Sequence, residues 1–378
     1  MSALIFYLVL VTAAASDQAS TTQPSQPPEQ QSIRQKLSPT ELSALLANAE
    51  EGDSNAQYAL GKAYQNGNGI SLNDESAAKW YRKAAEQGNG AAQNDLGIMY
   101  RLGQGVSRDK EEAVRWYRKA AKQGNAQSMF NLGVSYYNGD GVPSDPTAAY
   151  AWFLLAKEAG NPAAEDAVKR SAEEGGRLGT PEAIQLVAAM YEKGDDLQRS
   201  YSEAAKWYRK AADLSPQAAV SLASMLIDGR GGPQDYGQAM NICRSAAKQR
   251  YAPAQYCVGY LYQHGLGTQT DPKEAAKWYG EASKGGHHQA MLDLAEMYWK
   301  GEGVVVNRSE AYYFFFLAYR RGIISAKTQA ETLWKEMNKD DIKHIEKKLR
   351  DLRLDPQKVF AAMQAPSTSD KANSSSQP

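Results

Sequence analysis

The sequence has few of the residues from which catalytic and metal sites are most often built. It contains only 4 His and 2 Cys in 378 residues. Its 43 Lys and Arg are matched by 43 Asp and Glu, so the formal net charge is zero. A balanced chain has no field that attracts nucleic acid or an anionic membrane, and we expect no nucleic-acid partner.

Long hydrophobic runs are also missing. The apolar run at residues 4–11 is too short to cross a bilayer as a helix. Small residues follow at 13–15, so residues 1–15 are predicted to be a secretory signal cleaved after Ala15. The mature protein is then periplasmic or secreted, with no membrane attachment. Because no Lys or Arg precedes the apolar run, an uncleaved N-terminal anchor remains an alternative.

Motifs that carry known chemistry are absent as well. The sequence has no G-x-S-x-G elbow, no Walker A loop and no H-E-x-x-H helix. His287 and His288 are adjacent and have no Cys or carboxylate cluster at ligand spacing, so they are predicted to be surface turn residues and not metal ligands. We therefore expect no enzymatic activity, no cofactor and no metal.

What the sequence has in abundance is a repeat. WYRKAAEQGN at Trp80 recurs as WYRKAAKQGN at Trp116 and as WYRKAADLSP at Trp207. A small residue lies 19 positions before each Trp and serves as the reference of its unit. The distances between the reference residues of successive units are 36, 36, 55, 35, 36 and 36 residues. A fixed long period of this kind is typical of a solenoid of stacked helix pairs. The reference residues are Gly61, Gly97, Gly133, Ala188, Ala223, Gly259 and Ala295.

Each unit is predicted to contain two helices. The apolar residues around the reference recur with a helical period, and they define helix A. A G-x-G turn such as Gly67–Gly69 follows, whose first Gly suits a helix C-cap. Helix B then carries the Trp. One unit cannot bury its own apolar face, so stacked neighbours must bury it, which predicts an all-α solenoid of units of about 36 residues.

The 55-residue step indicates two arrays. It contains one period and one additional helix, at residues 162–174, before a Gly-rich joint near 175–180. The first array is predicted at 37–176, with Ser38 as the cap of its first helix, and the second at 177–365, with capping helices at its end. Apolar B helices at 149–156 and 311–318 predict a covering helix in each array. One continuous solenoid with an insertion remains the alternative.

The segments outside the arrays have a different composition. Residues 16–36 and 366–378 are rich in Gln, Pro, Ser and Thr and have few apolar anchors. They are predicted to be a disordered linker and a disordered tail.

The A-x-x-x-[LV]-[GA]-x-x-Y frame, the G-x-G-[VI] turn and the A-x-x-[WF]-Y-x-x-A-A run resemble the Sel-one-like repeat family, relatives of the tetratricopeptide repeat. The resemblance covers roughly residues 52–325, with departures at Leu226, Ile242 and 194–196. It implies a right-handed superhelix that acts as an adaptor or receptor-binding scaffold, exported in many bacterial members. Some Cys-rich members have been linked to β-lactam binding, which leaves a hydrolase as a remote alternative.

Three positions of helix A differ widely when the units are compared with one another. Together they form one face of the helix, opposite the apolar stripe that packs in the core. This face is predicted to be concave and to bind a partner protein, because aromatic residues anchor interfaces. A cell-envelope glycan or peptidoglycan is the alternative ligand, and coverage by neighbouring units is the alternative role for the aromatics. The predicted binding residues are Tyr58, Lys62, Arg101, Phe130, Tyr137, Tyr256, Tyr260 and Trp299.

Cys243 and Cys257 are 14 residues apart, on helix B of the fifth unit and helix A of the sixth. They lie at equal height beside one turn, so a disulfide is predicted, and an exported chain permits it. Other units have a Tyr and a short polar residue here, such as Tyr81 with Asp95, and the disulfide is predicted to replace a hydrogen bond of the Tyr hydroxyl. Two buried free thiols are the alternative.

Overall fold

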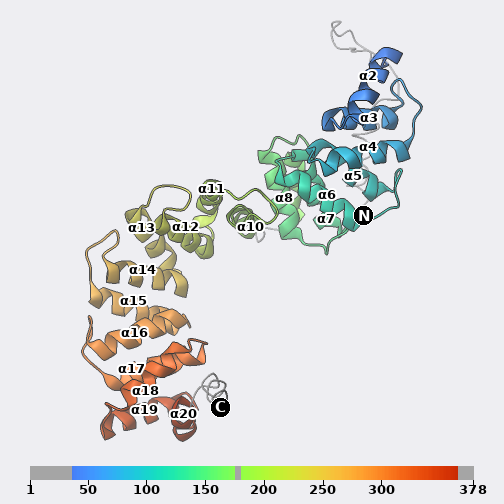
Figure 1. Cartoon of the computed structure of the whole chain (residues 1–378). Coiled ribbons are helices and arrows are strands. Elements are labelled where there is room, and N and C mark those ends of the chain that lie inside the picture. Colours follow the sequence, from blue (N-terminus) through green and yellow to red (C-terminus); the bar gives the residue numbers. More distant parts are fainter. Residues whose placement is uncertain (1–35, 175–179, 365–378) are drawn as a thin grey trace. The chain divides into compact units, whose positions relative to one another are not determined.

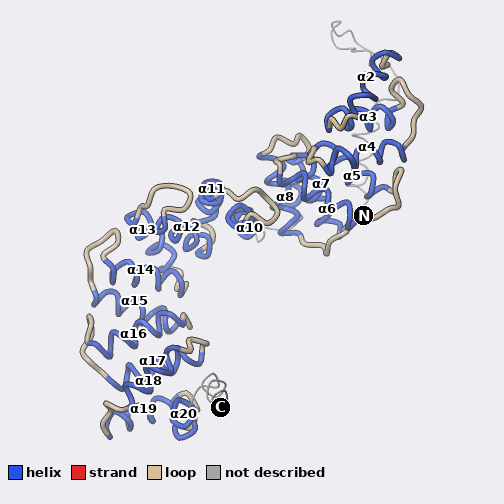
Figure 2. Tube along the Cα trace, in the orientation of Figure 1, coloured by secondary structure: helices blue, strands red, loops and turns tan. Residues whose placement is uncertain are grey.

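The structure is a computed structural model that describes residues 36–174 and 180–364. Within these ranges every regular element is an α-helix, which confirms the predicted all-α solenoid (Figures 1 and 2). None of the described helices has the length and apolar character needed to cross a membrane. The predicted signal, the Gly-rich joint, the tail and almost all of the linker lie outside the described residues.

The first unit comprises residues 1–199. From α2 to α9 its helices pack in chain order, each against the next, as the stacking of helix pairs requires, and α10 then packs against α8. After an initial helix α2 (Pro39–Glu50) come the pairs α3 (Ser54–Asn66) and α4 (Asp74–Glu86), α5 (Gly90–Leu102) and α6 (Lys110–Lys122), and α7 (Ala126–Asn138) and α8 (Pro146–Glu158), followed by α9 (Ala164–Glu174) and α10 (Thr180–Lys193).

The second unit comprises residues 200–378. It begins with α11 (Tyr201–Ala212) and continues in the same way, with three helical pairs and three closing helices. The pairs are α12 (Pro216–Asp228) and α13 (Tyr236–Ala247), α14 (Ala252–His264) and α15 (Pro272–Lys284), and α16 (His288–Lys300) and α17 (Arg308–Arg320); the closing helices are α18 (Ser325–Trp334), α19 (Lys339–Asp351) and α20 (Pro356–Gln364).

The division between the units falls inside the fourth repeat, after Arg199. The sequence places the joint earlier, at 175–180, most of which lies outside the described residues. Helix α10 is grouped with the first unit because it packs against α8, as helix A of one repeat packs against helix B of the repeat before it.

The ends of the arrays are built as the apolar patterns indicate. Ser38 caps α2 with a complete capping box, in which its hydroxyl accepts from the Glu41 amide and the Glu41 carboxylate accepts from the Ser38 amide. Helices α9 and α10 pack against the apolar α8, where Trp152 and Phe153 are buried. In the second unit the closing helices bury Phe315 of α17 in one apolar cluster. An apolar helix B is therefore followed by helices that cover it.

The G-x-G turns join successive repeats through the backbone. The first Gly of each turn, for example Gly103 with φ of 76°, ends helix A in the left-handed conformation. The second Gly, Gly105, lies against the first turn of the previous helix B: a Cβ added there would lie 2.0 Å from the Asp74 carbonyl oxygen. Gly141, Gly231, Gly267 and Gly303 make the same approach in other repeats. Only a residue without a side chain permits this contact.

In every repeat but the fifth, which has Cys243 at this position, an aromatic ring of helix B lies over the small reference residue. Tyr81, Tyr117 and Tyr279 of helix B are fully buried. A Cβ added to Gly97 would lie 2.6 Å from the Tyr117 ring, and the reference glycine of the sixth repeat is equally close to the Tyr279 ring. Close packing of this kind fixes the height of helix A against helix B and so positions the exposed helix A side chains.

Candidate binding groove

The helix A side of the second unit contains a cavity of about 320 Å³, which we call the helix A groove. It lies between α12 and α14 and is closed at one end by the residue that caps α16. Five of its nine lining residues occupy the helix A positions that vary between repeats. The groove is lined by Val220, Ser224, Ile227, Asp228, Pro253, Tyr256, Cys257, Tyr260 and His287.

Tyr256 is the groove side chain that is held by the most ring contacts with other aromatic residues. Its ring stacks with Tyr279 at 5.5 Å and with His287 at 4.3 Å between centroids. Burial, together with the charge of Asp293, raises the pKa of the Tyr256 hydroxyl far above its usual range. The phenol therefore stays neutral, and it is held by packing from three helices. A side chain held in this way loses little conformational entropy when a ligand binds.

His287 forms the end of the groove and also caps α16. Its Nδ1 accepts a hydrogen bond from the amide of Ala290 at 3.2 Å, so that nitrogen carries no proton. Burial, with the nearby His288, lowers the pKa of His287 to about 4. The imidazole is thus neutral near pH 7. The prediction of a plain surface turn residue is wrong for His287, which is partly buried, whereas His288 is exposed.

The groove as a whole is apolar and aromatic. Its one ionised side chain, Asp228, is paired with Arg230 at 3.0 Å. Tyr260 completes the wall, with its ring 4.1 Å from His264 and 6.4 Å from Tyr256. Such a surface suits a neutral side chain better than a charged ligand.

The structure places the other predicted binding residues outside the groove. Trp299 packs edge-on against Phe315, 6.0 Å away, at the start of the closing cluster. In the first unit the Tyr58 hydroxyl donates to Asp95 at 3.1 Å, and the exposed Lys62 lies 5.6 Å from the Tyr58 ring. Arg101 and Tyr137 are half-buried on α5 and α7.

Phe130 corrects the prediction. It is 6% exposed and packs against Phe153 of the apolar α8 at 5.5 Å. The alternative that neighbouring helices cover the aromatics therefore holds for Phe130, which belongs to the core. The ring contact itself is common to the repeats, since Tyr58 lies 5.6 Å from Tyr81 and Tyr256 lies 5.5 Å from Tyr279.

The disulfide lies at the floor of the groove. Cys243 of α13 and Cys257 of α14 are bonded, with a distance of 6.0 Å between their Cα atoms. The hydrogen bond that the disulfide was predicted to replace is not the one found in the other repeats. Tyr81 donates to Gln65 of its own repeat at 2.7 Å, while Asp95 accepts from Tyr58. The helix B tyrosine thus forms its hydrogen bond within its own repeat, whereas the acidic residue of helix A forms one with a tyrosine of the repeat before it.

We expect the stability of the second unit to fall below about pH 6.5. His287 titrates near pH 4 in the folded chain and near 6.5 when unfolded, so the unfolded chain takes up the proton first as the pH falls. The free energy of unfolding is then at its full value above about pH 6.5 and decreases towards pH 4. We expect a decrease of about 1–2 kcal/mol, which allows for the part of the ring that stays exposed to solvent.

Urea unfolding at several pH values, compared between the chain and His287→Asn, checks this. Asn is the capping residue in the other repeats at Asn89 and Asn125, so the variant keeps the cap and removes the titration. Asp293, whose pKa burial raises, acts in the opposite direction and is present in both proteins. Parallel pH profiles for the two proteins would contradict the expectation.

The described residues contain no cluster of three or more His, Cys, Asp or Glu side chains that could hold a metal ion. The sequence pointed to Tyr256 and Tyr260, which share the groove, but it missed the contribution of His287. A signal for His287 exists, because the same position holds the helix caps Asn89 and Asn125 in two earlier repeats.

Three regions of known proteins are similar to parts of this chain. Protein sel-1 homolog 2 of Homo sapiens is 29% identical over 119 residues, which is 31% of this chain and 17% of that protein. Chitin synthase regulatory factor 3 of Schizosaccharomyces pombe is 33% identical over 24% of this chain and 10% of its own length. Alginate biosynthesis protein AlgK of Azotobacter vinelandii is 29% identical over 28% of this chain and 23% of its own. The matched segments thus span less than a quarter of each of these relatives.

Two solved structures are similar over most of this chain. The first is c5321, described as a protective antigen of uropathogenic Escherichia coli with an SLR fold, at 31% identity, a TM-score of 0.44, and coverage of 82% of this chain and 63% of that one. The second is a Sel1 repeat protein from Oxalobacter formigenes, at 29% identity, a TM-score of 0.40, and coverage of 78% and 80%.

The family comparison covers more than half of the chain. The model of the Sel1 repeat matches seven successive segments, at 54–89, 90–125, 126–161, 181–215, 216–251, 252–287 and 288–323. Each segment contains one helix A, its turn and one helix B, as the repeat pattern predicted. The chain is a member of the Sel1-repeat family.

Proposed function

We propose that this chain is an exported scaffold whose helix A groove binds an apolar or aromatic side chain of a partner protein. Sel1-repeat proteins are protein-interaction scaffolds on a fold that is not built for catalysis, which supports the class of function. The observation that carries the proposal is the groove itself: a hollow of about 320 Å³ whose aromatic walls are held in place by stacking. Preorganised apolar pockets are where interface anchors insert.

A protein is preferred to a glycan because of the state of the aromatic rings. Sugars bind to open ring faces flanked by polar groups, whereas Tyr256 is already stacked with Tyr279 and His287. The polar groups of the groove are few, and Asp228 is paired with Arg230. Both features favour a neutral, compact side chain.

Export is part of the proposal. It rests on the predicted signal at residues 1–15 and on the Cys243–Cys257 pair, since structural disulfides persist mainly in oxidising compartments.

Photo-crosslinking in the native cell tests the groove. A photoreactive residue at Ser224, which lines the groove, is expected to trap one protein, identified by mass spectrometry. The same residue at Ser245, exposed on helix B of the same repeat, is the matched control and is expected to trap none of it. Equal trapping at both positions would contradict the proposal.

We expect Tyr260→Ala to weaken binding of the trapped partner at least about tenfold, because it removes an aromatic anchor from the groove wall. Leu214→Ala, at an exposed leucine outside the groove, is the control and should bind as the unchanged chain does. Both variants should keep their helicity by circular dichroism. If Tyr260→Ala reduced binding of the chain to purified peptidoglycan and left binding of the protein partner unchanged, the glycan alternative would replace this proposal.

A further inference from the structure

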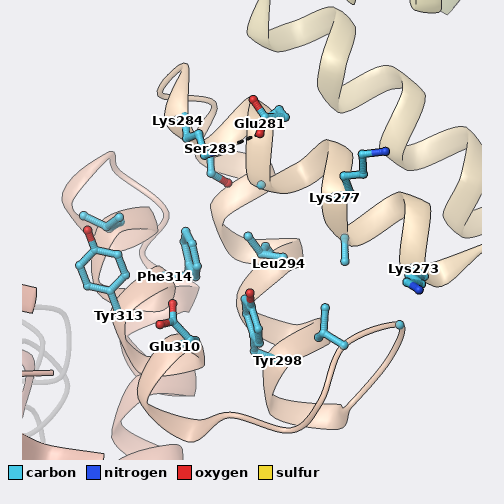
Figure 3. A pocket seen from close by; sticks show the side chains of 15 residues that line it. Lys273, Lys277, Glu281, Ser283, Lys284, Leu294, Tyr298, Glu310, Tyr313 and Phe314 are labelled. Carbon is cyan, nitrogen blue, oxygen red and sulfur yellow. Dashed lines mark hydrogen bonds and ion pairs between the residues drawn. The ribbon is translucent and has the colours of Figure 1, made fainter. Parts of the chain in front are cut away.

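A second and larger pocket lies on the helix B side of the second unit. Its volume is about 680 Å³, and it lies between α15 and α17 over one face of α16 (Figure 3). Leu294, Phe314 and Leu317 form apolar walls, and Tyr298 and Glu310 bring a hydroxyl and a carboxylate to the same hollow. Gly280 lines the pocket and occupies a position that is Arg in four other repeats.

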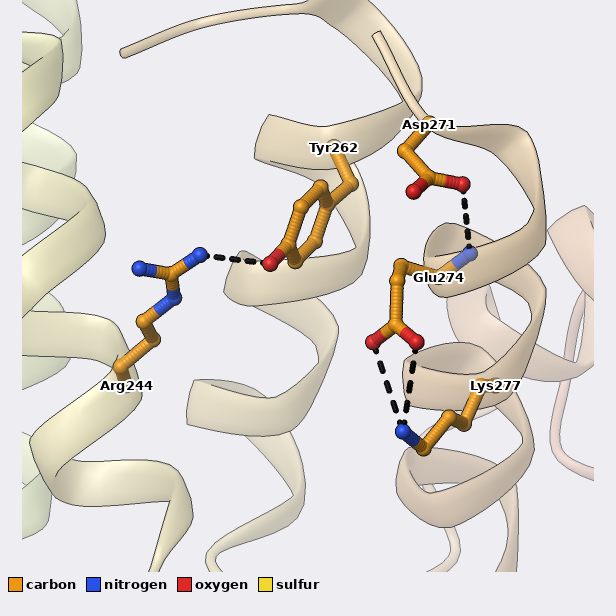
Figure 4. A network of polar contacts seen from close by, with 5 residues as sticks. All are labelled: Arg244, Tyr262, Asp271, Glu274 and Lys277. Atoms are coloured by element: carbon orange, nitrogen blue, oxygen red, sulfur yellow. Dashed lines mark hydrogen bonds and ion pairs between the residues drawn. The ribbon is translucent and has the colours of Figure 1, made fainter. Parts of the chain in front are cut away.

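The other repeats show what normally fills this position. Arg244 donates from its guanidinium to the Tyr262 hydroxyl at 2.5 Å, and its Cζ lies 5.4 Å from the centre of that ring (Figure 4). Arg118 donates to Tyr136 at 2.7 Å, and Arg82 donates to Tyr100. In each case the Arg precedes its Tyr by 18 residues. The fold therefore holds a guanidinium between consecutive B helices, on the hydroxyl and ring of a Tyr.

In the sixth repeat the Tyr is kept and the Arg is lost. Tyr298 follows Gly280 by the same 18 residues, and its hydroxyl has no hydrogen-bond partner among the residues that the structure describes. A Cβ added to Gly280 meets no atom within 4 Å. The corresponding cavity beside Arg82 measures only about 300 Å³.

We propose that this pocket binds an arginine side chain presented by a partner protein. The guanidinium takes the position that Arg244 takes one repeat earlier: it donates to the Tyr298 hydroxyl, lies against the Tyr298 ring and approaches the Glu310 carboxylate. The charge of Glu310 already acts on Tyr298, since it adds to burial in raising the pKa of that phenol. Leu294 and Leu317 lie against the methylene groups of the incoming side chain.

Of the three lysines that line the pocket, two are paired with carboxylates, and Lys273 is the third. Lys277 is paired with Glu274, and Lys284 is paired with Glu281 at 2.6 Å. Glu310 is paired with Lys348, and the His344 ring lies 3.5 Å from its carboxylate. The site of Arg82 is similar, because Lys79 and Lys83 line it and it still holds a guanidinium. A planar guanidinium also fits a hydroxyl and a ring face better than the compact ammonium of lysine does.

A short Gly-flanked arginine peptide, titrated into the full chain and followed by saturation-transfer NMR, tests the proposal. Matched peptides carry lysine, citrulline or glutamate in place of the arginine. We expect millimolar binding of the arginine peptide alone, its loss in Gly280→Arg, its retention in Gly280→Ala, and a weakening of about threefold or more in Tyr298→Phe from the lost hydrogen bond. No binding by the unchanged chain, equal binding by Gly280→Arg, or equal binding of the other peptides would overturn the proposal.

A second measurement reports on the pocket without any peptide. Gly280→Arg is expected to unfold at a higher temperature than Gly280→Ala, because both gain helix propensity but only the Arg fills the pocket. If the two variants melted together, the pocket would not accept a guanidinium. Tyr260→Ala leaves this site intact, so the proposals for the helix A groove and for the arginine pocket are tested independently.

Discussion

Replacing Gly105 with alanine will destabilise the first unit by about 3 kcal/mol or more, the largest effect we expect from a single methyl group in this chain. The added Cβ would lie 2.0 Å from the Asp74 carbonyl oxygen and 2.7 Å from the Glu75 amide nitrogen. Both are backbone atoms at the start of α4, so no side-chain rotation can relieve the clash. The repeat must move away from its neighbour, and the buried contacts between them are lost.

Gly88→Ala, in the preceding repeat, is the control. Gly88 also has a positive φ, of 93°, but a Cβ there meets nothing within 4 Å. It should cost only the backbone strain of a left-handed alanine, about 1–2 kcal/mol. Urea unfolding followed by circular dichroism measures both variants. If the two lost the same stability, the close backbone approach at Gly105 would have no energetic role.

Reduction of the disulfide is expected to lower the stability of the second unit by about 3 kcal/mol, because a closed loop of about 15 residues restricts the unfolded chain by that amount. Cys243 is fully buried on α13 and Cys257 lies at the groove floor on α14, so the bond joins two consecutive repeats. The unfolding midpoint in urea, with and without reductant, measures the effect. Mass spectrometry of exported protein after thiol alkylation should find neither cysteine modified.

The control is the chain in which both cysteines are replaced by alanine. Its stability should not respond to reductant, and it should resemble the reduced chain apart from the cost of two small cavities. A reductant effect of equal size in this variant would show that the disulfide is not its origin. Fully alkylated cysteines in the exported protein would support the free-thiol alternative instead.

The fold was predictable from the sequence because the repeats supply an internal comparison. Gly61, Gly97 and Gly133 recur at one spacing, and the packing that requires them is local to each hairpin. The helix ends followed from local rules also: Ser38 reads as an N-cap, and Gly67 as a C-cap, within a few residues of sequence. Such rules depend on neighbours in the chain, so the sequence contains them in full.

The binding surface was only partly predictable. The variable positions identified Tyr256 and Tyr260, which line the groove, but gave no means to separate them from Phe130, which is buried. The column analysis also could not assign the hydroxyl of Tyr81 to Gln65 rather than to Asp95, because both lie within reach of a Tyr side chain. These outcomes depend on contacts between repeats that the repeat pattern does not encode.

The glycine contact of the G-x-G turns also bears on how such a chain can evolve. Where the G-x-G turn is kept, a repeat is spaced from the previous one by an approach of backbone to backbone, as at Gly105 and Gly303, and no helix A side chain takes part in it. Mutations in Tyr256, Tyr260 or Ser224 leave that spacing untouched. Selection can therefore change what the groove recognises while the repeat spacing is inherited unchanged, and a duplicated repeat brings its own means of attachment to the array.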